Sequence, residues 1–154
     1  MPDIISRLLT HWADAGAQPA GGVTEEEIEV FQRTHNIRMP NDLRSYFLKV
    51  NGMKSDWHCD QDGNGFTFWP LARLHCLGPV AYPGPGESTD CPTFFVFADY
   101  LTSCWDYAIG LWSREREGNA ILLINSPNKI VANSFSEFVD LCVLDSPQLY
   151  PHGK

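Results

Sequence analysis

The chain has 154 residues, of which 44% are hydrophobic and 12% aromatic, and its formal net charge is -8. This composition excludes an intrinsically disordered chain, and the length suits one domain with a self-sufficient hydrophobic core. The acidic balance argues against binding to nucleic acid or to an anionic membrane, because like charges repel. Most of the charge lies mid-chain, where seven acidic residues between positions 55 and 113 accompany one basic residue, Arg73.

The cysteines and the N-terminal residues bear on the cellular compartment. The first residues have no basic segment ahead of an apolar run, as a signal peptide would, and no apolar stretch approaches the roughly 20 residues of a membrane helix. We therefore expect a cytoplasmic protein. Five scattered cysteines form no C-x-x-C pair, so their spacing predicts neither a zinc ribbon nor a redox motif: Cys59, Cys76, Cys91, Cys104 and Cys142.

Three helices are predicted in the N-terminal third of the chain. Residues 3–15 place apolar side chains at helical spacing, and a flexible glycine-rich connector follows at 16–22. The sequence TEEE from Thr24 has the form of a capping box, which predicts that a second helix begins there. A third helix is expected over residues 40–50, stopped by Asn51-Gly52 because both residues tolerate a left-handed backbone.

The polar segment that follows contains DQDGNG at residues 60–65, which matches the first six positions of a calcium-binding loop. The match then fails, because the twelfth position is Leu71 instead of glutamate and residues 66–69 are typical of a strand. We therefore interpret this segment as a tight turn that leads into a strand. A loop rich in proline and glycine runs from Pro83 to Pro92.

The strongest strand signal covers residues 93–112. Residues 93–98 are rich in aromatic and β-branched side chains, and residues 105–112 alternate between two unlike faces with the two-residue period of a strand. The link between them is too short for a helical crossover, so the two strands are expected to pair as an antiparallel hairpin. Asp99 and Asp106 would then lie close together across the hairpin.

Two further strands are expected at 119–125 and 130–133, and a second capping box from Ser134 opens a closing helix. We predict an α+β fold, in which an antiparallel or mixed sheet of about four to six strands is packed by N-terminal helices and a C-terminal helix. The expected organisation is an N-terminal helix with its Gly-rich connector at 1–22, a main domain at 23–145 and a frayed tail at 146–154.

Three stretches carry a resemblance to a known family. They are VTEEEIEVFQRTHNIRMPNDLRSYFLKVNG at residues 23–52, the strand pair FVFADY and WDYAIGLW, and IVANSFSEFVDLC at 130–142. Together and in this order, they resemble the SUKH superfamily, which includes the SMI/KNR family of yeast cell-wall regulators and many bacterial immunity proteins. The resemblance implies an α+β domain that binds and neutralises a toxin made by the same cell, often a nuclease or deaminase. The N-terminal helix and the 83–92 loop depart from the family's pattern.

The residue patterns predict no catalytic residue, metal ion or cofactor. The pairs His58-Cys59 and His75-Cys76 could serve a thiol enzyme or a zinc site, but neighbours in a strand point to opposite faces. Asp99 and Asp106 could act as a general acid and base, because close carboxylates shift each other's protonation. Binding is favoured over catalysis for these two aspartates, and the alternative is that they only solvate a strand end and cap a loop.

Tryptophans accompany the acidic middle of the chain, and tryptophan is a common anchor at protein interfaces. An acidic rim with aromatic anchors would receive a basic toxin domain through electrostatic steering and a buried contact. The leading hypothesis is a non-enzymatic immunity protein that binds neither nucleic acid nor membrane. The alternatives are a scaffold or regulatory protein that binds another protein, and a small-molecule-binding or hydrolytic enzyme. The candidate partner-binding residues are Trp57, Asp60, Asp62, Trp69, Asp99 and Asp106.

Overall fold

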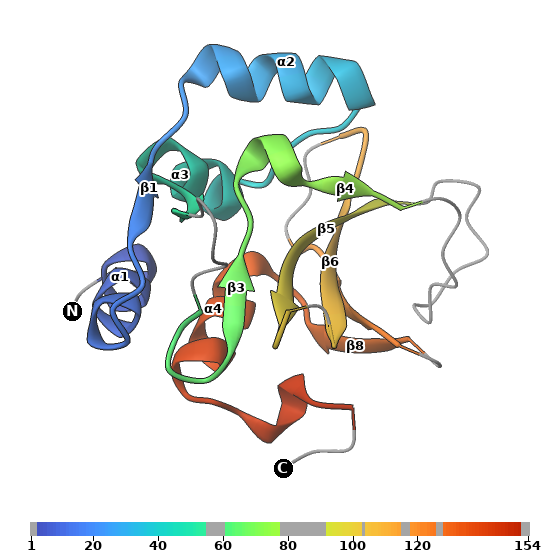
Figure 1. Ribbon diagram of the computed structural model, residues 1–154. Helices are drawn as coiled ribbons and strands as arrows, with labels where there is room; N and C mark the ends of the chain where they lie inside the picture. The colour runs from blue at the N-terminus through green and yellow to red at the C-terminus, as the bar shows by residue number, and fades with distance from the viewer. Residues whose placement is uncertain are drawn as a thin grey trace.

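The computed structural model describes residues 3–54, 61–77, 92–102, 104–114, 118–125 and 128–151. Within these ranges, α-helices pack against a six-stranded antiparallel sheet, and a separate two-stranded sheet joins the N-terminal segment to the domain (Figure 1). The predicted α+β class with an antiparallel sheet is therefore confirmed. Every helix in the described part of the chain is too short or too polar to span a membrane.

The helices follow the predicted order. Thr24 Oγ1 accepts a hydrogen bond from the Glu27 amide at 3.1 Å, and Ser134 Oγ accepts one from the Glu137 amide at 3.0 Å. These bonds satisfy amides that have no acceptor within their own helix. The α-helices are α1 (Ile4–Asp14), α2 (Glu25–His35), α3 (Asn41–Lys49) and α4 (Phe135–Val143), and the 3-10 helices are η1 (Leu71–Arg73) and η2 (Pro147–Leu149).

The six-stranded sheet has the order β3-β5-β6-β7-β8, and β4 also pairs with β5. The predicted hairpin consists of β5 and β6, in which Asp99 lies directly opposite Asp106. The two-residue strand β4 was not predicted. The strands are β3 (Phe66–Phe68), β4 (His75–Cys76), β5 (Thr93–Tyr100), β6 (Trp105–Leu111), β7 (Ile121–Ile124) and β8 (Lys129–Ala132).

Strand β5 contains one more residue than β6 over the same length. Val96 lies opposite Ala108, but the next pair is Ala98 with Tyr107, so Phe97 is the extra residue of a β-bulge. Phe97 and Ala98 both join the core that the helices cover. The alternation of side chains is therefore shifted by one residue beyond the bulge, which turns Asp99 toward the opposite side of the sheet.

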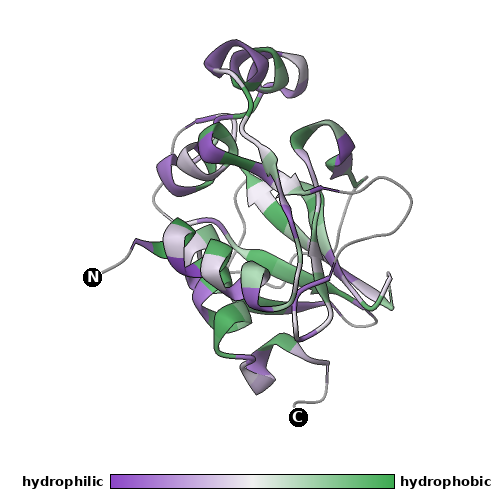
Figure 2. Ribbon diagram, turned by 60° about the vertical axis from the view of Figure 1, so that its left-hand side comes forward, coloured by the Kyte–Doolittle hydropathy of each residue, from purple (hydrophilic) through white to green (hydrophobic). Residues whose placement is uncertain are grey.

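The two faces of the sheet carry separate apolar clusters. All four α-helices contribute buried side chains to the main cluster, which includes Trp12, Ile28, Tyr46 and Phe138. Figure 2 shows that the central strands are largely hydrophobic, whereas the helices carry many hydrophilic residues. The opposite face, called the outer face below, holds a smaller cluster of Trp69, Phe94, Val96, Ala108 and Leu122.

Helix α1 is docked on the rest of the domain. Trp12 is fully buried and packs against Phe68, with ring centroids 5.3 Å apart. His11 Nε2 lies 2.9 Å from Asp62 Oδ2, at the turn before β3. Contacts between α1 and α4 complete this attachment, so the N-terminal segment belongs to the main core.

Two predictions about neighbouring segments were wrong. The connector after α1 is not a free linker, because β1 (Pro19–Gly21) pairs antiparallel with β2 (Val50–Met53). The helix predicted over residues 40–50 is confirmed as α3, which ends at Lys49, but Asn51-Gly52 lies within β2 and is not the left-handed stop of that helix. Gly52 has a φ of +70° and lies against the backbone of Trp69, where an added Cβ would come within 2.6 Å of the carbonyl carbon.

The prediction of a frayed tail was also wrong for the residues that are described, which extend to Pro151. Tyr107 Oη donates a hydrogen bond to the Leu149 carbonyl at 2.6 Å, and Gln148 Nε2 donates one to the Val131 carbonyl at 2.7 Å. Burial raises the pKa of the Tyr107 phenol, so its hydroxyl remains a donor at neutral pH. The tail is held because it completes the core: the Leu149 side chain is fully buried.

Substituting Leu149→Ala should lower the free energy of unfolding by about 2–5 kcal/mol, because it opens a cavity in a packed core. The matched control is Leu144→Ala, since Leu144 is 74% exposed and its truncation should cost within about 0.5 kcal/mol. Urea unfolding followed by tryptophan fluorescence measures both values. Equal losses for the two variants would show that the C-terminal segment does not contribute to the core.

Candidate functional site

The structure describes four of the six predicted partner-binding residues, and Trp57 and Asp60 lie outside the described ranges. Asp62, Trp69 and Asp99 are buried, and Asp106 is half-buried. Asp62 lies at the turn before β3, whereas the other three belong to the outer face or its margin. The four side chains therefore do not form one exposed acidic surface, and their part in binding stays a prediction.

Asp62 organises the turn that leads into β3. Its Oδ1 accepts hydrogen bonds from the amides of Asn64 at 2.8 Å and Phe66 at 3.0 Å, and its Oδ2 contacts His11. An aspartate that binds the amide two residues ahead stabilises a turn. The interpretation of this segment as a tight turn before a strand is therefore confirmed. Both carboxylate oxygens of Asp62 are hydrogen-bonded within the protein.

Asp99 and Trp69 are held together on the outer face. Trp69 Nε1 donates a hydrogen bond to Asp99 Oδ2 at 2.7 Å, and Asp99 is only 2% exposed. The Arg73 guanidinium lies over the Trp69 ring, 4.5 Å from its centroid, in a cation–π contact. This arrangement fixes the indole in place, and it engages the Asp99 carboxylate that was considered as a general acid or base.

The cysteines and histidines do not converge within the described part of the chain. His75 and Cys76 are consecutive in β4, so their side chains point to opposite faces. Cys142 is fully buried, and burial raises the pKa of its thiol, which disfavours the nucleophilic thiolate. No group of three or more His, Cys, Asp or Glu side chains in the described ranges could hold a metal ion.

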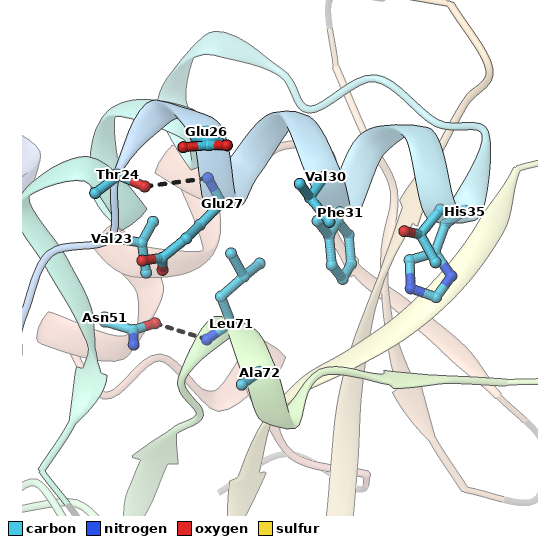
Figure 3. A pocket seen from close by; sticks show the side chains of 11 residues that line it. Val23, Thr24, Glu26, Glu27, Val30, Phe31, His35, Asn51, Leu71 and Ala72 are labelled. Carbon is cyan, nitrogen blue, oxygen red and sulfur yellow. Dashed lines mark hydrogen bonds between the residues drawn. The ribbon is translucent and has the colours of Figure 1, made fainter.

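A groove that the sequence did not reveal lies between α2 and the segment that contains η1 (Figure 3). Its volume is about 640 Å³, within the range of ligand-binding clefts. Helix α2 and the residues before it form one wall, and β2 and η1 supply the other. The groove, called the α2 groove below, is lined by Val23, Thr24, Glu26, Glu27, Val30, Phe31, Thr34, His35, Asn51, Leu71 and Ala72.

Helix α2 is attached to the domain along a narrow stripe, which leaves its groove side accessible. Only Ile28 and Gln32 of this helix are buried. Gln32 Oε1 accepts a hydrogen bond from the Met39 amide at 2.8 Å, and Arg44 of α3 lies 3.3 Å from Glu29. These contacts secure α2 from the side away from the groove, so its facing side chains keep exposed surface.

A hydrogen bond joins the two segments that form the opposite wall of the groove. Asn51 Oδ1 accepts a hydrogen bond from the Leu71 amide at 2.7 Å, which ties β2 to η1 (Figure 3). Phe31 closes the inner side, with its ring 5.3 Å from that of Phe95 in β5 and 4.6 Å from that of His35. The groove thus has a preformed apolar floor, as binding sites commonly do.

The model of the SMI1 / KNR4 family (SUKH-1) matches residues 22–141. The chain belongs to the SMI1/KNR4 family (SUKH-1). This result confirms the resemblance found in the sequence, and the SUKH-1 match contains every residue that lines the α2 groove. A search among curated proteins found no match.

Two helices lie outside the residues that the SUKH-1 family model matches. Helix α1 precedes the matched region and η2 follows it, although both pack on the same core. The SMI1/KNR4 family is not a known family of enzymes.

Substituting Trp69→Phe should destabilise this SUKH-1 domain by about 1–3 kcal/mol, because it removes a hydrogen-bond donor from a buried carboxylate. Trp105→Phe is the control: it removes an indole donor from a neutral hydroxyl, Tyr107 Oη, at a half-buried site. Its cost should be smaller, and chemical unfolding followed by circular dichroism compares the two. A Trp69→Phe cost no larger than that of the control would contradict an anchoring role for Asp99.

Proposed function

We propose that this SUKH-1 protein is a non-enzymatic protein-binding domain that neutralises a basic toxin domain of the nuclease or deaminase type. It would act in the cytoplasm, on a toxin made by the same cell. The observation that carries the proposal is the α2 groove, an accessible apolar concavity in which Glu26 and Glu27 are the only formally charged side chains among the described lining residues. Membership of the SMI1/KNR4 family supports the same assignment.

The charge of the whole chain supports a basic partner. A net charge of -8 attracts a cationic domain over distances longer than any single contact, and it discourages association with nucleic acid or anionic lipid. Toxins that act on nucleic acid need basic surfaces for their substrate. An acidic protein that covers such a surface would block the substrate by occupying its place.

Co-expression provides the direct test. Cells that carry the toxin encoded beside this chain should grow when the chain is present, and the two proteins should elute as one complex in size-exclusion chromatography. A catalytically inactive toxin allows the complex to be measured without growth selection. Absence of both rescue and complex would refute the neutralising role, whereas a complex with an unrelated housekeeping protein would favour a regulatory scaffold.

Association with the toxin should slow as salt is added, because the Debye length falls from about 10 Å at 0.1 M to about 3 Å at 1 M. The dissociation rate should change less, since it reflects the desolvated contact instead of long-range steering. Stopped-flow mixing across this salt range separates the two rates. An association rate that is insensitive to salt would be inconsistent with an acidic receiving surface.

A further inference from the structure

The α2 groove has two chemically different ends. Figure 3 shows Glu26 and Glu27 near Thr24 at the start of α2, whereas Val30, Phe31 and His35 follow toward its C-terminal end. Leu71 and Ala72 of η1 lie across the groove from them. A ligand that fits this site would therefore present charge at one end and apolar surface at the other.

The acidic end of the groove has no basic side chain paired with it among the described residues. Glu25 and Glu29 lie on the same helix but face Arg44, at 3.8 Å and 3.3 Å. Glu26 and Glu27 form no salt bridge within the described part of the chain. Both glutamates are exposed, and none of the lining residues that the structure describes is a lysine or arginine. The groove is thus complementary to a cation at this end.

The apolar end exposes side chains that a folded domain ordinarily covers. Val30 is 47% exposed, which makes it one of the few large hydrophobic side chains on the described surface. It lies beside Phe31, which the rings of Phe95 and His35 hold in position. An apolar side chain inserted here would bury Val30 and Phe31 without rearranging either wall, which favours binding because little ordering is required.

The spacing along α2 defines what would fit. Glu27 and Phe31 are four residues apart, a separation of about 6 Å along the helix. A partner helix laid along the groove would match this distance with a basic residue and an apolar residue three or four positions apart. Helix-in-groove recognition commonly uses anchors at this spacing.

We propose that the α2 groove receives an amphipathic helix of the toxin, with a lysine or arginine against Glu26 and Glu27 and aliphatic anchors against Val30, Phe31 and Leu71. This inference rests on the proposed function, because it names the binding surface and the partner segment. It also moves the expected site away from the acidic middle of the chain, where Asp62 and Asp99 are buried.

Two matched pairs of variants test the surface. Glu26→Lys reverses a charge in the groove, and Asp14→Lys makes the same change at an exposed position of α1. Val30→Arg fills the apolar end, and Leu144→Arg makes the same change at an exposed site outside the groove. Each groove variant should weaken binding to inactive toxin by at least about tenfold, while each control stays within about twofold of wild type.

The outcomes separate this inference from the proposed function. If the wild-type chain binds and neutralises the toxin but the groove variants match their controls, the groove inference is overturned and the neutralising role remains. If the wild-type chain neither binds nor neutralises it, the neutralising role fails. Circular dichroism and urea unfolding of all four variants establish that a loss of binding is not a loss of folding.

A second measurement does not depend on the toxin. The probe is a synthetic helical peptide of about 14 residues, with lysine at one position and leucine four and seven positions later, titrated into isotope-labelled protein. Amide shifts confined to α2, β2 and η1, and absent with a peptide in which glutamate replaces the lysine, support the inference. Three outcomes would overturn the inference. They are the absence of amide shifts up to about 1 mM peptide, equal shifts with both peptides, and groove shifts that come from self-association of the protein.

Discussion

The extra residue in β5 is the constraint on which both faces of the sheet depend. With regular alternation after Phe95 and Phe97, the next inward side chain would be Asp99, placed among aromatic rings. The bulge puts Ala98 there instead and turns Asp99 outward to the Trp69 indole. Trp69 lies two residues before η1, and Gly52 of β2 lies against the Trp69 backbone. The hydrogen bond between Trp69 and Asp99 therefore helps to position the wall of the α2 groove that β2 and η1 form.

Much of the fold was predictable because its signals are local. The alternation of residues 105–112 predicted β6, and Thr24 and Ser134 predicted where two helices begin. The bulge could not be predicted, because apolar residues occupy both faces of β5 and hide a shift of one residue. The docked tail was missed for a similar reason: the residues that hold Leu149 and Gln148 come from β6 and β8 respectively, and only the folded chain brings them together.

The candidate site shows the same limit. Sequence reasoning found the acidic residues but not their burial. Residue type alone does not distinguish an aspartate that caps a turn, like Asp62, from one that is exposed on a surface. It interpreted the glutamates after Thr24 as a helix start, which the structure confirms. Nothing in the sequence around Val30 indicated that this side chain is exposed. The groove combines residues from α2 with Asn51 and Leu71, and no local pattern joins segments so far apart in the chain.

The contact between Gln148 and Val131 has a consequence for the solution behaviour of the domain. Strand β8 is the last strand in the sheet order, so its outer edge could template the addition of a strand from another molecule. The Gln148 side chain donates a hydrogen bond to the Val131 carbonyl of that strand, and Lys129 Nζ donates one to the Tyr150 carbonyl. The segment that completes the core therefore also shields an edge, and a chain cleaved before it would be prone to edge-to-edge assembly as well as less stable.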